Sequence, residues 1–232
     1  MPSDTGFHLK QDLHDRPSIM QMILVPSIIT LLITLLRLAG EMKGWSEVFF
    51  RRSAGGFGAL VGIAWLVPVF GIYFALKLAK MGFGPRGALR AVGIVLAALV
   101  VEIGVGLVPM TFHGDYRAQL SFMALGAVIG IAIAISAWPA LGKTLLAYGL
   151  AARIPVAIIM FLAMRGNWGT HYDVSSPDLP VLPFLQKWFW IGLLPQATLW
   201  IAYTVLFGII FGAIAYAVAR RRTSPVDVMQ SA

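Results

Sequence analysis

The chain has 232 residues, a formal net charge of +8, and a composition that is 59% hydrophobic and only 12% charged. Soluble domains contain roughly 45–50% apolar and about 25% charged residues, so a water-soluble fold would have too little polar surface to cover this apolar excess. The chain contains no cysteine, which excludes disulfides, thiolate-bound zinc and Fe–S clusters held by this chain alone.

Apolar stretches of spanning length, for which roughly 20 residues are needed, recur about six times along the chain. The first of them is too long for a cleavable signal peptide and indicates a retained helix. We therefore predict an all-α, polytopic transmembrane helical bundle, expected in a bacterial cytoplasmic (inner) membrane. Its predicted spans are 19–39, 55–76, 88–110, 119–141, 144–164 and 188–218.

The lysines and arginines between the spans predict the sidedness, because such residues accumulate in cytoplasmic loops. With the N-terminus inside, the inner segments carry ten of them and the outer segments seven. Residues 1–18 and the basic stretch 219–232 are accordingly predicted to be cytoplasmic tails around a single transmembrane domain at 19–218. The inner link 77–90 either marks topology only or also binds anionic lipid headgroups, through Lys77, Lys80, Arg86 and Arg90.

The segment 165–187 is the longest link, and we predict that it forms an ordered extracytoplasmic loop. Its prolines favour an extended path over a helix, and its turn-forming residues favour a fixed conformation. The last span contains Pro195, seven residues after its predicted start. We expect it to begin as an interfacial or kinked segment, with the crossing itself starting nearer Pro195 than Trp188.

Three spans carry two glycines four residues apart, a spacing that lets helix backbones approach closely in a membrane. The pattern fits packing within one chain, and it fits self-association or binding to other membrane subunits. Membrane lipids are the other expected partners. The glycine pairs are Gly58 and Gly62, Gly126 and Gly130, and Gly208 and Gly212.

An acid and a base lie inside the predicted spans, Glu102 in the third and Arg153 in the fifth. Charged groups in hydrocarbon are costly and normally face the bundle interior, where they find a partner. From the helical rise their depths differ by only about 4–5 Å. Gln196 falls near the same depth and Tyr203 extends the polar face. The four residues predict either a polar site for a substrate, ion or proton in the outer half of the bilayer, or a structural Glu–Arg pair.

Two His-x-Asp pairs lie in the predicted outer loops, His113 with Asp115 and His171 with Asp173. Imidazole and carboxylate groups on one face of the membrane could bind a divalent metal or act as a general base with its orienting acid. The same residues are also typical of a solvated loop, so both interpretations stay open.

Several absences narrow the function. No histidine lies in a predicted span, which argues against a haem held between two histidines, and no lysine lies mid-span to form a retinal Schiff base. The sequence also lacks a P-loop and the common hydrolase and zinc-protease motifs. Basic residues flank the spans without interleaved aromatic residues, which argues against nucleic-acid binding. We predict no cofactor.

Three functions remain. The first is a permease-like protein or the membrane component of a transport system, favoured by proline-interrupted helices and the polar residues at matched depth. The second is an accessory or scaffold subunit of a larger membrane complex. The third is a membrane-embedded enzyme that uses the outer-loop histidines and aspartates.

Overall fold

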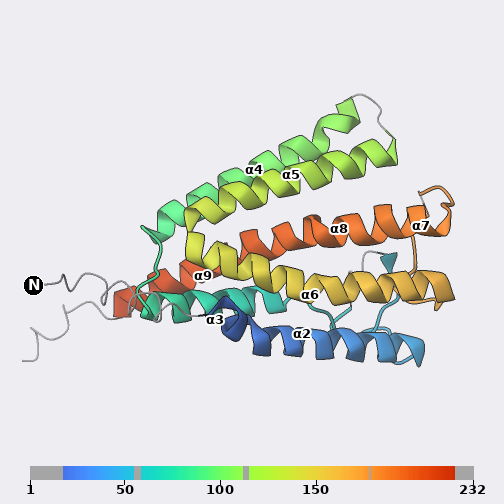
Figure 1. Ribbon diagram of the computed structural model, residues 1–232, viewed down its shortest axis with the longest axis horizontal. Helices are drawn as coiled ribbons and strands as arrows, with labels where there is room; N and C mark the ends of the chain where they lie inside the picture. Colours follow the sequence, from blue (N-terminus) through green and yellow to red (C-terminus); the bar gives the residue numbers. More distant parts are fainter. Residues whose placement is uncertain (1–17, 55–58, 112–114, 178, 223–232) are drawn as a thin grey trace, which may run out of the picture.

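The computed structural model describes residues 18–54, 59–111, 115–177 and 179–222 and is all-helical over these ranges. Figure 1 shows elongated helices that run roughly along one common direction, as in a bundle. The elements are α2 (Ile19–Met42), α3 (Leu66–Lys80), α4 (Ala88–Thr111), α5 (Tyr116–Ala137), α6 (Pro139–Gly166), α7 (Phe184–Lys187), the π-helix η2 (Trp188–Leu193), α8 (Leu194–Ala197) and α9 (Leu199–Arg222).

Five helical segments of the described chain are long and apolar enough to cross a membrane: α2, α4, α5, α6 and the stretch from Phe184 to Arg221. Large apolar side chains such as Leu89, Val100 and Met110 lie exposed on their outer faces, where a bilayer would cover them. The predicted class, an integral membrane protein built as an all-helical bundle, is therefore confirmed.

The predicted span at 55–76 is wrong in its extent. Its helix, α3, begins only at Leu66 and has 15 residues, too few for the roughly 20 that a full crossing needs. Pro68 lies in the first turn of α3, where its missing N–H costs no hydrogen bond. Glycines 55, 56 and 58 lie outside the described residues, and the stretch 59–65 is irregular.

The irregular stretch 59–65 satisfies part of its backbone within the protein. The N–H groups of Leu60 and Val61 donate to the carbonyls of Val48 (3.2 Å) and Phe49 (3.0 Å). The hydroxyl of Tyr203 donates to the carbonyl of Ala64 at 3.4 Å. Non-helical backbone at membrane depth is tolerated only where protein or a cavity surrounds it. The stretch 59–65 therefore lies against other parts of the protein or lines a cavity.

The turn between α5 and α6 lies at Trp138 and Pro139, not near residues 142–143 as predicted. Pro139 is the first residue of α6, a position that suits proline because its N–H would be unpaired there. The indole N–H of the buried Trp138 donates to the carbonyl of Phe83 at 2.7 Å. That bond fixes the turn against the α3–α4 link.

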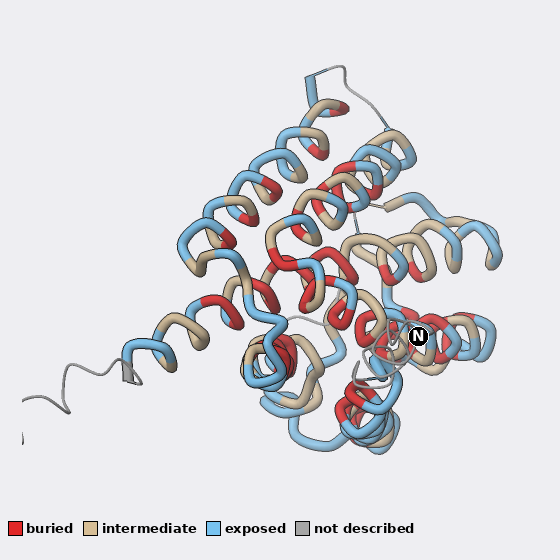
Figure 2. The backbone as a smooth tube through the Cα atoms, turned by 60° about the vertical axis from the view of Figure 1, so that its left-hand side comes forward, coloured by how far each residue is buried: buried red, intermediate tan, exposed pale blue. Residues whose placement is uncertain are grey.

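Helix α9 contacts α3, α4, α5 and α6, whereas α2 packs mainly on α6. Helices α4 and α5 form an antiparallel hairpin that extends from one side of the bundle (Figure 1). Figure 2 shows the buried residues concentrated where helices face each other and exposed residues along their outer faces. The fully buried side chains in the middle include Phe74, Leu145 and Ile209.

The glycines at helix crossings pack within the chain. A Cβ added at Gly71 would lie 2.7 Å from the Cα of Gly208, and one at Gly212 would lie 2.8 Å from the Cβ of Ala75. Gly126 and Gly130 similarly face Glu102 across the α4–α5 hairpin. Two of the three predicted pairs thus serve intramolecular packing, and Gly58 of the third lies outside the described residues. Self-association stays a prediction.

The last span is irregular near its start, and a crossing that begins nearer Pro195 than Trp188 stays a prediction. Helix α7 passes into the π-helix η2 and then into α8, and Thr198 leaves the helical region with φ −126° and ψ −73°. The helix α9 starts immediately afterwards. π-helical turns and broken helices recur at functional sites, and these lie beside the irregular stretch 59–65.

The crossing of α3 and α9 yields a stability prediction. Gly71→Ala forces a methyl group against the backbone of Gly208, and overpacking of this kind costs about 1–3 kcal/mol. We therefore expect a clearly lower Tm for the detergent-purified protein, measured by circular dichroism. Gly104→Ala on α4 is the matched control, because its Cβ would meet nothing within 4 Å. Equal melting temperatures for the two variants would contradict this packing.

Candidate functional site

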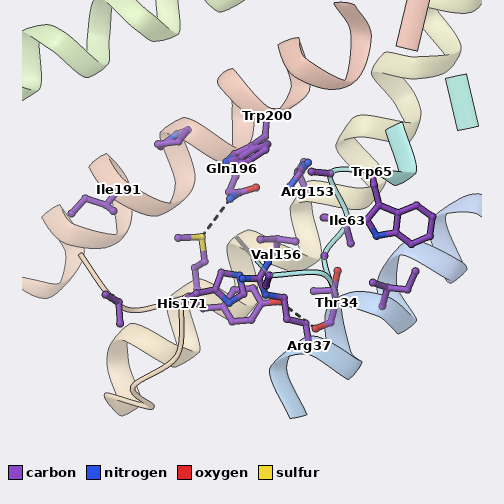
Figure 3. Close-up of a pocket in the computed structure, with 18 of the residues that line it drawn as sticks. Thr34, Arg37, Ile63, Trp65, Arg153, Val156, His171, Ile191, Gln196 and Trp200 are labelled. Carbon is purple, nitrogen blue, oxygen red and sulfur yellow. Dashed lines mark hydrogen bonds between the residues drawn. The ribbon is translucent and has the colours of Figure 1, made fainter. Parts of the chain in front are cut away.

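A pocket of about 730 Å³ lies between α2, the irregular stretch 59–65, α6, the segment 167–183 and the interrupted last span. Roughly 300–1,000 Å³ is the usual size of a small-molecule site. Figure 3 shows Arg153, Gln196 and Trp200 grouped on one side of the pocket, with Thr34, Arg37 and His171 on the other. Most of the remaining lining is apolar, including Ile33, Ile63, Trp65, Val156, Met160 and Ile191.

Arg153 is the cation of this pocket that has no carboxylate beside it. Helix α6 holds the side chain at 6% exposure, and its guanidinium carbon lies 4.7 Å from the centroid of the Trp200 ring. Its Nε is buried without a hydrogen-bond partner. Among the described residues around the pocket, the carboxylate of Glu41 pairs with Arg37 and accepts a hydrogen bond from His171, and it does not pair with Arg153.

Gln196 reaches the same pocket from α8. Its side chain is 8% exposed, its Oε1 atom is buried without a partner, and its Nε2 atom has only the sulfur of Met160 at 3.7 Å. The predicted grouping of Arg153 with Gln196 is thus observed. Tyr203, predicted to extend this polar face, instead bonds the backbone of Ala64 beside the pocket.

Glu102 does not join this group, so the expected Glu102–Arg153 contact is wrong. Its helix α4 packs on α5 and α9, and the carboxylate faces Gly130, whose added Cβ would lie 3.0 Å from Glu102 Oε2. Matching depths along two helices does not bring side chains together, because the rotation of each helix and the helices between them also matter. Here α4 pairs with α5 through small residues.

A second charged cluster borders the pocket, and its acidic member went unnoticed in the sequence. Glu41, at the end of α2, is fully buried. Its Oε1 atom accepts hydrogen bonds from Arg37 Nε (2.8 Å) and from His171 Nδ1 (2.6 Å), and its Oε2 atom accepts one from the backbone N–H of His171 (2.8 Å). An Arg–Glu pair four residues apart in an otherwise apolar helix is the sequence signal that could have revealed it.

The same cluster ties in the loop after α2. Arg37 Nη2 donates to the carbonyl of Arg51 at 3.2 Å, and Arg52 donates to the backbone carbonyl of Glu41. The Glu41 carboxylate therefore joins α2 to the segment after α6, while Arg37 and Arg52 attach the loop after α2 to the same end of α2. Charges buried in this way stabilise a specific arrangement only when they are fully paired, as Glu41 is.

The segment that follows α6 is organised by Asp173. One carboxylate oxygen accepts from the backbone N–H (2.7 Å) and the hydroxyl (2.7 Å) of Thr170, and the other accepts from the N–H of Gly169 (2.9 Å). Asn167 and Gly169 adopt positive φ values of 47° and 66°, which Asn and Gly tolerate best. This turn places His171 against Glu41, and an ordered extracytoplasmic loop at 165–187 stays a prediction.

Asp115 and the pair His171 and Asp173 bond to different parts of the protein. Asp115 caps α5 by accepting from the N–H groups of Arg117 (3.1 Å) and Ala118 (2.9 Å), while Asp173 and His171 bond as described above. His113 lies outside the described residues. Within the described ranges, no three His, Asp or Glu side chains gather as a metal site would require. A metal or catalytic function for these residues stays a prediction.

The basic link 77–90 lies at the end of the bundle opposite the pocket, where α3 ends and α4 begins (Figure 1). Lys77, Lys80, Arg86 and Arg90 are all exposed there. Lys77 also approaches Tyr73, with Nζ 3.2 Å from the hydroxyl. Exposure leaves the four cations accessible to lipid headgroups, and that interaction stays a prediction.

His171 makes the pocket wall sensitive to pH. Burial lowers the pKa of His171, and Arg37 adds to this effect, while the bond to Glu41 opposes it. The unfolded chain therefore binds more protons than the folded one below a pH of about 6.5, the ordinary pKa of histidine, so folding stability falls as the pH drops through this range.

We expect the Tm of the purified protein to be highest above about pH 6.5 and to fall by several degrees toward pH 5. His171→Asn places an amide near the position of Nδ1 and cannot titrate, so it should remove most of this pH dependence while keeping a bond to Glu41. An unchanged pH profile in His171→Asn would show that another group is responsible.

No protein-family model, curated protein or solved structure matches this chain. Its function therefore has to be inferred from the pocket and the bundle around it. What the long apolar helices establish is the class: this is an integral membrane protein.

Proposed function

We propose that this protein is a permease-like membrane component that receives its substrate in the pocket around Arg153 and Gln196. On the predicted topology, the pocket lies in the outer half of the bilayer and faces the outer side. The observation that carries the proposal is the buried guanidinium of Arg153, which faces a pocket of about 730 Å³ with no counter-ion among the described residues.

The cost of burying such a charge supports a binding role. An isolated ion taken out of water loses several kcal/mol even after the surroundings relax, and intramembrane charges commonly mark substrate or ion pathways. A purely structural arginine would be expected to have a carboxylate partner. Glu102, one candidate on the neighbouring helices, lies instead in the α4–α5 hairpin.

The backbone around the pocket supports transport in particular. The stretch 59–65 is irregular, and the last span contains a π-helix and a kink at Thr198, whose dihedrals leave the helical region. Interrupted helices at a membrane-embedded site are a recurring feature of transporters, because they place polar backbone groups at the substrate and allow rigid-body movements around it.

Beyond the pocket, the other half of the bundle is tightly packed. Gly71 and Gly208 bring α3 and α9 into backbone contact, and Leu145 packs against Gly208 from α6. A permease with this arrangement would be open toward the outer side, and the α3–α9 contact would have to separate for release on the inner side. An accessory subunit or an enzyme would need no such movement.

Cysteine accessibility tests the proposal, and the native chain has no cysteine to interfere. Val156→Cys places a thiol in the pocket wall, and Ile158→Cys, two residues further along α6, places one on the exposed outer face. We expect a charged, membrane-impermeant methanethiosulfonate reagent to modify Val156→Cys and to leave the lipid-facing control unmodified.

The comparison of vesicles of opposite orientation decides between the functions. A permease predicts fast modification of Val156→Cys from the outer side and slower modification from the inner side, because the pocket must open to both. Modification from the outer side alone would favour a scaffold or an enzyme. A thiol sealed from both sides, yet reactive after unfolding, would contradict a substrate pocket.

A further inference from the structure

We propose that the pocket binds an amphiphilic monoanion: a molecule with one carboxylate, phosphate-ester or sulfonate group on a hydrophobic body. This inference rests on the proposed function for the role of the pocket, and it adds the chemical class of the ligand. The charge, the polar atoms and the apolar walls each contribute an independent part of the argument.

The charge of the pocket comes from Arg153. Arg37 also lines the cavity, but its charge is balanced by Glu41 at 2.8 Å. His171 is held as a neutral donor, because burial lowers the pKa of its imidazole. One positive charge is left without a negative one among the described groups, so a single anionic group would neutralise the site.

Gln196 indicates which hydrogen-bonding groups of the ligand lie beside its anionic group. Its Oε1 atom is buried and accepts no hydrogen bond, and its Nε2 atom has only a weak contact with the Met160 sulfur. The amide could donate from Nε2 to the anion and accept at Oε1 from a hydroxyl or amide N–H of the same molecule. Unpaired buried polar atoms of this kind cost free energy until a ligand satisfies them.

The walls indicate a hydrophobic body. Leu60, Ile63, Val156, Ile191 and Trp200 line the cavity together with the charged and amide groups. A small hydrophilic anion such as phosphate would leave most of this apolar surface in contact with water, whereas an alkyl or ring-containing body would cover it.

The contact with Trp200 does not by itself account for Arg153. A cation–π contact is a weak interaction that does not offset the cost of burying a lone ion. The buried charge of Arg153 therefore destabilises the unliganded protein, and a bound anion would remove this destabilisation. Sites of this kind trade stability for function, which gives a stability readout separate from binding.

Binding is best measured on the purified full chain in phosphatidylcholine nanodiscs, by thermal shift and isothermal titration. The probes share a ten-carbon tail and differ in head: decanoate, decanesulfonate, decanol and decyltrimethylammonium, with acetate as the tail-free anion. We expect decanoate and decanesulfonate to bind and raise the Tm, and the other three to bind at least about tenfold more weakly. Native mass spectrometry after reconstitution with phosphatidylglycerol separates a lipid source of the anion from a soluble one.

Arg153→Met keeps the length of the side chain and removes its charge, and Arg165→Met removes an exposed charge from the same helix as the control. We expect Arg153→Met to weaken decanoate binding about ten- to hundredfold, the range that one charge-assisted contact contributes, and to raise the Tm of the unliganded protein. The control should change neither quantity. A lower Tm in Arg153→Met with undiminished decanoate binding would assign Arg153 a structural role and overturn the inference.

The two proposals fail in different ways. Equal binding of decanol and decanoate, or preference for decyltrimethylammonium, would overturn the ligand class even if Val156→Cys reacts from both sides of the membrane. Arg153-dependent binding of decanoate, with Val156→Cys reactive from the outer side alone, would support the ligand class and count against transport.

Discussion

The carboxylate of Glu41 joins α2 to the segment after α6, two of the parts of the chain that surround the pocket. It lies fully buried at the end of α2 and accepts bonds from Arg37 on its own helix and from the backbone and imidazole of His171. Without those donors the carboxylate would be a lone buried charge, which is strongly destabilising. The position of His171 in turn depends on the turn that Asp173 organises. A small number of strong polar bonds thus fixes one wall of an otherwise apolar site.

On the opposite wall of the pocket, the buried polar groups are not fully paired. Arg153 and Gln196 are buried as deeply as the Glu41 cluster, yet each retains an atom without a protein partner. This difference between the two walls of the pocket supports a binding function. A side whose groups are all paired supplies rigidity, and a side with unpaired groups supplies the capacity to bind. The irregular stretch 59–65 closes the space between them with backbone bonds to Val48 and Phe49.

The two halves of the bundle differ in packing for a simple reason of residue size. Where α3 and α9 cross, Gly71 and Gly208 leave no side chain between the backbones, and close contact replaces the hydrophobic driving force that lipid does not provide. Toward the pocket, Trp65 and Trp200 line the cavity, and the dihedrals of Thr198 leave the helical region. The α4–α5 hairpin uses the first principle again at Gly126 and Gly130, and it thereby places Glu102 away from Arg153.

The sequence by itself determined the class and most of the helices, because hydrocarbon requires long apolar segments whose backbone bonds are internal. It also indicated Arg153, Gln196 and the interrupted last span, since charge, amide and proline are conspicuous in apolar runs. Only the tertiary structure decided which of these residues meet. Depth can be counted along a helix, but rotation and helix neighbours depend on packing, so Glu102 was misplaced and Glu41 was missed. The irregular stretch before Pro68 was likewise decided by contacts with distant loops, which no local apolar pattern encodes.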